Sequence, residues 1–147
     1  MQYKVIESGG YTHRIVEVDG LLLYLNPRAP RSDTPMLDNT TKKMAYALAN
    51  PEIVKGVASH YRENPAQAIL QLGHSTRGMH LCFCGAVSSN VDYLLPNGYA
   101  TNRLAAHYLA WHRDSIPEDE FQAAADMDIE LPEEDEAFEQ LIKAMIQ

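Results

Sequence analysis

Cys82 and Cys84 are the only cysteines of the chain, and they lie two positions apart in a short apolar segment. His80 lies two positions before Cys82. Side chains alternate between the two faces of a strand, so a strand here would place all three on one face. Thiols and imidazoles are the side chains that bind zinc and that carry out nucleophilic chemistry. The segment around Cys82 and Cys84 is therefore the only dense cluster of reactive side chains in the sequence, although it completes no known motif.

A metal site is the first hypothesis, because a structural zinc ion needs four thiolate or imidazole ligands. The expected ligands are His80, Cys82, Cys84 and His107, with His74 or His112 as alternatives, and the expected metal is zinc. Two features argue against this site. Ligands two apart on a flat strand lie about 6.5 to 7 Å apart along the chain. His107 and His112 are five residues apart, which places them about 140° apart around a helix.

A nucleophilic thiol is the second hypothesis. The expected catalytic residues are Cys84, His107 and His112, because a nearby imidazole activates a thiol by holding its proton. Such a pair needs a third group that orients the base, and Asp92 or Asp114 could serve if the fold brings it close. No recognised local motif surrounds this cysteine.

Two further interpretations of the cysteines remain open. Free cysteine is among the most buried residue types, which favours a pair of core residues. A redox role is disfavoured, because redox dithiols normally have the Cys-x-x-Cys spacing at a helix N-terminus. Closure of Cys82 onto Cys84 would need a kinked backbone.

A ligand site for an anion or an aromatic group is predicted from Arg77, Arg103 and Trp111. Arg103 and Trp111 lie eight residues apart and share a helix face with His107, and Arg77 lies in a glycine-containing loop. The competing interpretation places Trp111 in the core. No nucleotide-binding motif accompanies these residues.

The chain has 147 residues and a net charge of −8. Its length suits one domain with its own hydrophobic core. It has no apolar run of about 20 residues, so we expect that it does not enter a membrane. It also lacks the pattern of a secretory signal, so we expect a cytoplasmic protein, in which the thiols are reduced. Residues 114–147 carry twelve acidic residues and one lysine, whereas residues 1–113 have a net charge of +3. The negative charge of residues 114–147 repels phosphate groups, which disfavours nucleic acid as a partner.

The apolar pattern predicts an α+β fold with an N-terminal antiparallel β-meander, central helices, a short β-hairpin and C-terminal helices. The meander uses residues 3–7, 11–18 and 21–25. Central helices are expected at 38–49, 51–61 and 65–73, the hairpin pairs strands at 79–84 and 91–95, and later helices cover 101–113 and 115–127.

Residues 1–128 are expected to form one α+β domain, and 129–147 an acidic linker with an amphipathic helix. That helix needs an apolar surface to pack against, on its own domain or on another protein. The favoured function is a small acidic binding or regulatory protein that contacts a protein partner, or a second copy of itself, through its C-terminal third. The alternative is a small enzyme or ligand-binding protein that uses the cysteine and histidine cluster, with or without zinc.

Overall fold

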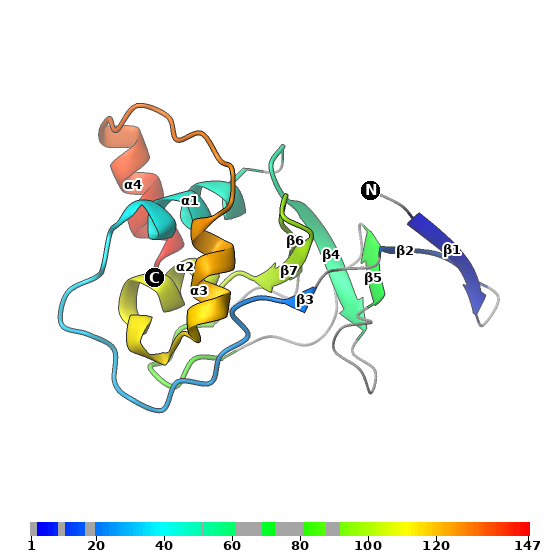
Figure 1. The fold of residues 1–147 in the computed structure, drawn as a ribbon, viewed down its shortest axis with the longest axis horizontal. Helices are drawn as coiled ribbons and strands as arrows, with labels where there is room; N and C mark the ends of the chain where they lie inside the picture. Colours follow the sequence, from blue (N-terminus) through cyan, green and yellow to red (C-terminus); the bar gives the residue numbers. More distant parts are fainter. Residues whose placement is uncertain are drawn as a thin grey trace.

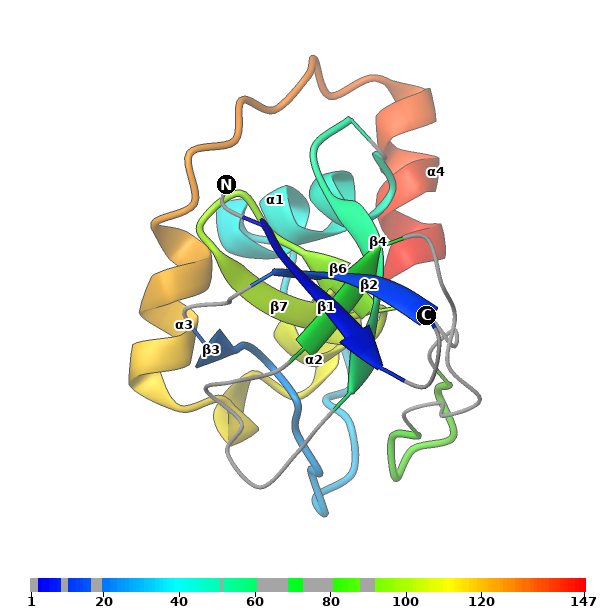
Figure 2. The same ribbon diagram turned by 90° about the vertical axis from the view of Figure 1, so that its right-hand side faces the viewer.

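The fold is described from a computed structural model, which defines residues 3–8, 11–16, 20–50, 52–60, 69–72, 81–87 and 92–147. Within these ranges, the strands form one mixed sheet and four α-helices gather at one end of the molecule (Figures 1 and 2). The predicted α+β class is therefore confirmed. None of the helices in these ranges combines the length and the apolarity needed to cross a bilayer.

The strands are β1 (Tyr3–Ser8), β2 (Tyr11–Val16), β3 (Gly20–Leu21), β4 (Lys55–His60), β5 (Ile69–Leu72), β6 (Asp92–Leu94) and β7 (Tyr99–Asn102). Their order across the sheet is β1-β2-β5-β4-β6-β7-β3. The helices are α1 (Asn39–Leu48), α2 (Ala105–Trp111), α3 (Glu118–Ala125) and α4 (Glu136–Met145), and a 3-10 turn, η2 (Arg113–Ser115), follows α2.

The predicted N-terminal meander is wrong in its third strand. β1 and β2 form the expected antiparallel pair, with Tyr3 opposite Val16. β3, however, has only two residues and pairs in parallel with β7 at the other edge of the sheet. Leu22 and Leu23, which were expected to extend this strand, are instead fully buried in the hydrophobic core.

The helix predicted for 38–49 is confirmed, and the Asp38 side chain caps it by accepting from the Thr41 backbone N–H at 3.1 Å. The helix predicted for 51–61 is wrong at 52–60, because 55–60 form β4 between β5 and β6, and 51 and 61 lie outside the described residues. The helix predicted for 65–73 is wrong at 69–72, which form β5, and 65–68 and 73 lie outside the described residues. Short apolar runs fit either periodicity, and only pairing with neighbouring strands decides between them.

The C-terminal helices are present, with shifted starts. Thr101 belongs to β7, so α2 begins at Ala105, and α3 begins at Glu118 without a side-chain cap from Ser115. α4 is capped by Asp135, and its apolar residues Phe138, Ile142 and Met145 are buried. They belong to the same hydrophobic cluster as α1 and α2, and α4 lies beside α1 in Figure 1.

The predicted hairpin between 79–84 and 91–95 is wrong. β6 pairs with β4 and β7, while Leu81 pairs with Val87 in an isolated bridge that closes a tight turn. Residues 79, 80 and 91 of the predicted hairpin lie outside the described residues.

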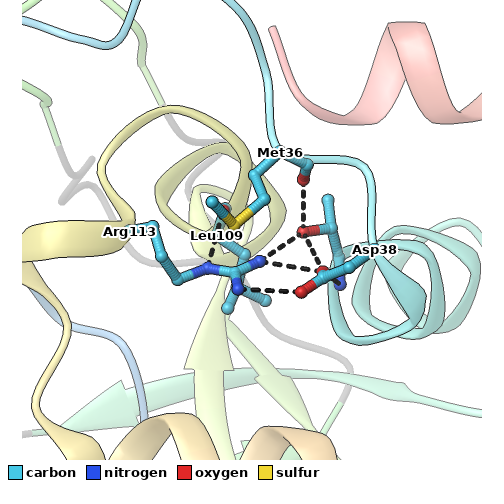
Figure 3. A network of polar contacts seen from close by, with 5 residues as sticks. Met36, Asp38, Leu109 and Arg113 are labelled. Carbon is cyan, nitrogen blue, oxygen red and sulfur yellow. Dashed lines mark hydrogen bonds and ion pairs between the residues drawn. The ribbon is translucent and has the colours of Figure 1, made fainter.

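Asp38 also joins α1 to the end of α2. Its carboxylate accepts two hydrogen bonds from the Arg113 guanidinium, each at 2.8 Å, and Arg113 Nε donates to the Leu109 carbonyl at 3.0 Å (Figure 3). Arg113 also donates to the Thr41 hydroxyl, which in turn donates to the Met36 carbonyl. The hydrogen bond from Arg113 lowers the pKa of Asp38 from 3.8 to about 2, against the opposing effect of burial.

Asp38→Asn is expected to lower the free energy of unfolding by roughly 1 kcal/mol at pH 7, because Asn still caps α1 but loses the charge that Arg113 binds. The Asp38 pKa is lower in the folded state, so its contribution is fully present above pH 3.8 and is lost as the pH falls toward about 2. Urea denaturation of both proteins between pH 7 and pH 2 measures this. A stability difference that stays constant down to pH 2 would show that the carboxylate charge does not stabilise this junction.

Candidate metal centre

The cysteines lie in a tight turn rather than on a flat strand. The Cys82 backbone N–H donates to the Ala86 carbonyl at 2.8 Å, and the Gly85 N–H donates back to the Cys82 carbonyl at 2.9 Å. Gly85 has a φ of 101°, a conformation that side chains other than hydrogen rarely allow. The turn places the Sγ atoms of Cys82 and Cys84 3.5 Å apart. The predicted divergence of the two thiols is therefore wrong.

α2 presents His107 from within the helix and His112 from just beyond it. α2 ends at Trp111, and His112 has φ −130° and ψ 39°, which is not helical. The 140° separation expected for a continuous helix therefore does not apply, and the imidazole rings lie with centroids 5.2 Å apart. The prediction that these two histidines lie on different faces of one helix is wrong, because α2 ends before His112.

Cys82, Cys84, His107 and His112 form a group that could hold a metal ion. One ligand atom from each lies within 4.8 Å of all the others. Cys84 Sγ lies 3.2 Å from His107 Nε2, and Cys82 Sγ lies 3.3 Å from His112 Nε2. A tetrahedral ion with bonds of about 2.0 to 2.3 Å separates its ligand atoms by about 3.3 to 3.8 Å. The group thus needs only small adjustments to surround one ion.

Burial sets the protonation of three of the four side chains. Cys82, His107 and His112 are buried, whereas Cys84 is exposed. Burial lowers the pKa of both His107 and His112, which keeps the imidazoles neutral and able to bind metal near pH 7. Burial raises the pKa of Cys82, so this side chain favours the thiol form unless a cation stabilises its thiolate.

The end of α4 orients the His107 ring from the side opposite the cysteines. Its Nδ1–H donates to the Ile146 carbonyl at 3.0 Å, and the Trp111 indole N–H donates to the same oxygen at 3.0 Å. This bond places the proton on Nδ1 and leaves the Nε2 lone pair directed at the cluster. Histidines that bind metals commonly have such a partner.

The structure places three of the four predicted metal ligands, Cys82, Cys84 and His107, in one cluster. His112, expected as an alternative ligand and as a catalytic residue, takes the fourth place. His80, the remaining predicted ligand, and His74 lie outside the described residues.

The predicted catalytic residues Cys84, His107 and His112 also lie in this cluster. If His107 is the base, its Nδ1–H donates to the Ile146 backbone carbonyl rather than to the carboxylate of Asp92 or Asp114. Asp92 is buried and Asp114 is exposed.

Two of the three residues of the predicted ligand site, Arg103 and Trp111, bond instead to the end of α4. Arg103 donates to the carbonyls of Met145 and Ala144, and Trp111 also lies beneath the Arg31 guanidinium. Arg77 lies outside the described residues. An external ligand at these positions stays a prediction.

Sequence reasoning did not identify two features of the site. Ile146 acts through its backbone carbonyl, which no side-chain pattern reveals. The turn at Cys82 could have been found, since glycine directly after Cys84 is a common turn signal.

Comparison of the chain with protein-family models, with curated proteins and with solved structures found no match.

Removal of Ile146 and Gln147 is expected to weaken metal binding by about 10- to 100-fold, because His107 loses the acceptor that orients its ring. The dissociation constant is measured by competition with a chromophoric chelator at a temperature where the chain stays folded. Ile142→Ala is the control, because it removes a buried side chain of α4 and keeps the Ile146 carbonyl. Equal weakening in both variants would show that α4 affects the site only through overall stability.

Proposed function

We propose that this chain is a zinc-binding protein in which Cys82, Cys84, His107 and His112 hold one structural zinc ion. The observation that carries the proposal is the mutual approach of the four ligand atoms, within 4.8 Å, from two separate segments of the chain. Two thiolates and two imidazoles are a common ligand set of structural zinc. The hydrogen bond from His107 to Ile146 supports it further, since it leaves the metal-binding nitrogen free.

The completeness of the ligand set favours a structural ion over a catalytic one. Catalytic zinc has three protein ligands and keeps its fourth position for water or substrate. One of the four residues, His112, also lines a cavity, which would be the place for a substrate of a catalytic site. This cavity has a volume of about 410 Å³ and is lined by parts of 29–36 and 110–115. However, His112 Nε2 lies 3.3 Å from Cys82 Sγ, within the cluster. The alternative of a small enzyme acting through this cluster therefore has less support.

Zinc would fix the turn at 81–87 onto α2. An isolated β-bridge between Leu81 and Val87 closes this turn on itself. The side chains of Leu81, Phe83 and Val87 are exposed, so they do not hold the turn against the core. Within the turn at 81–87, Cys82 is the one residue whose side chain is fully buried in the hydrophobic core. Metal binding by a folded site adds directly to the free energy of folding.

The proposal predicts about one zinc ion per chain in protein purified without chelator, measured by elemental mass spectrometry. Cys82→Ser and His112→Ala are each expected to reduce zinc to a small fraction of this value. Free zinc at a thousand times the dissociation constant is expected to stabilise the fold by about 4 kcal/mol over the metal-free chain.

Asp114→Asn is the matched control, because Asp114 is exposed, lies two residues after His112 and is not one of the four residues of the cluster. Its substitution should leave the zinc content unchanged. Protein that neither retains nor takes up zinc would contradict the proposal. So would zinc that persists in both ligand variants.

The earlier hypothesis of a protein contact through the C-terminal third stays a prediction. The apolar face of α4 packs within this chain, so a partner would meet the exposed carboxylates on residues 126–136. Self-association through that apolar face would require α4 to leave α1.

A further inference from the structure

The four side chains of the cluster differ in their access to solvent. Cys84 is exposed, whereas Cys82, His107 and His112 are buried. A small oxidant in solution therefore reaches the cluster through the sulfur of Cys84. A bound divalent cation keeps this sulfur as a thiolate at neutral pH, and the thiolate is the nucleophilic form of cysteine.

A second sulfur lies next to the exposed one. The Sγ atoms of Cys82 and Cys84 are 3.5 Å apart, and a disulfide requires about 2.05 Å, so they need to approach by about 1.5 Å. Accessible cysteines with such a neighbour are typical sites of reversible oxidation.

The backbone between the sulfurs is already bent. Residues 82–85 form a turn, and Gly85 has the positive φ that such a bend uses. Among the described residues, no atom beyond the immediate neighbours lies within 4 Å of the position that a Cβ on Gly85 would occupy. Closure of Cys82 onto Cys84 was expected to need a kinked backbone, and this turn supplies the kink.

Resting on the proposed zinc site, we propose that Cys84 is an oxidation site for hydroperoxides, and that its oxidation closes a disulfide with Cys82 and releases the zinc ion. The site then acts as a switch that responds to oxidants.

The reaction balances in two steps. The Cys84 thiolate attacks the terminal peroxide oxygen, the O–O bond breaks, and the alkoxide or hydroxide leaves and takes a proton from water, which gives a sulfenic acid on Cys84. The Cys82 thiolate then attacks this sulfur, the S–S bond forms, and hydroxide leaves and takes a second proton. The two sulfurs together lose two electrons, which the peroxide gains.

The disulfide removes two of the four zinc ligands. Two neutral imidazoles remain. A structural zinc ion needs four ligands, and these two carry no negative charge to balance the ion, so they do not hold it. Reduction by a dithiol restores both thiolates and allows zinc to bind again.

The test treats the zinc-loaded full chain with hydrogen peroxide and follows zinc release with a chromophoric chelator and thiol loss with a thiol reagent. Trypsin cleaves after Arg77 and Arg103, so one peptide carries both cysteines. The expected result is one zinc released and two thiols lost per chain, with this peptide lighter by two hydrogens. Dithiothreitol and zinc should then restore the starting state.

Cys84→His is the matched variant, since it keeps four potential ligands and cannot form the disulfide. Its zinc release by peroxide is expected to be slower by about tenfold or more. Cys82→His retains the exposed thiolate, so its Cys84 should be oxidised without forming an intramolecular disulfide. If either variant fails to bind zinc, the peptide mass of the natural chain still decides the question.

Three results would overturn this inference without contradicting the proposed zinc site. These are zinc retained at peroxide concentrations that oxidise a free cysteine peptide, zinc released with a disulfide between two chains, and zinc released with only sulfinic acid on Cys84. Protein that never binds zinc would overturn the proposed function and this inference together.

Discussion

The buried imidazole of His107 is the constraint on which the rest of the site depends. Its ring is fully buried, and a buried polar atom without a partner is costly, so both nitrogens need one. Nδ1 finds the Ile146 carbonyl, and Nε2 faces Cys84. One side chain therefore joins the last turn of α4, the central helix α2 and the cysteine turn. These segments are far apart in the sequence, and the fold has to bring all of them to this ring.

α2 can position the site because it is held at both ends. At its start, the Asn102 carboxamide accepts from the Leu104 N–H at 2.8 Å and donates to the Leu23 carbonyl at 2.9 Å. At its end, Arg113 binds the Asp38 carboxylate of α1. The helix between them is buried on all sides from Ala105 to Ala110. A helix packed in this way has little freedom to move, so His107 within it and His112 directly after it are held in place.

The sequence predicts features that depend on neighbouring residues and misses those that depend on distant ones. Asp38 identifies the start of α1, because the side chain of a cap bonds within its own first turn. The cysteines and histidines identify the candidate ligands by type. β4 was predicted to be a helix, since its strand partners are remote in sequence. The convergence of His107 and His112 depends on where α2 ends, and the orientation of His107 depends on a backbone carbonyl 39 residues away.

Charge gives a reason for a divalent ion in this cluster. His107 and His112 are neutral, and burial opposes ionisation of Cys82. Two thiolates around a divalent cation carry no net charge, so the complete unit can lie against the apolar core at a much lower desolvation cost than its separate ions. A monovalent ion would leave a net negative charge there, and a trivalent ion a positive one. In the proposed zinc site this charge balance favours a divalent ion, and the exposed position of Cys84 leaves one sulfur open to solvent.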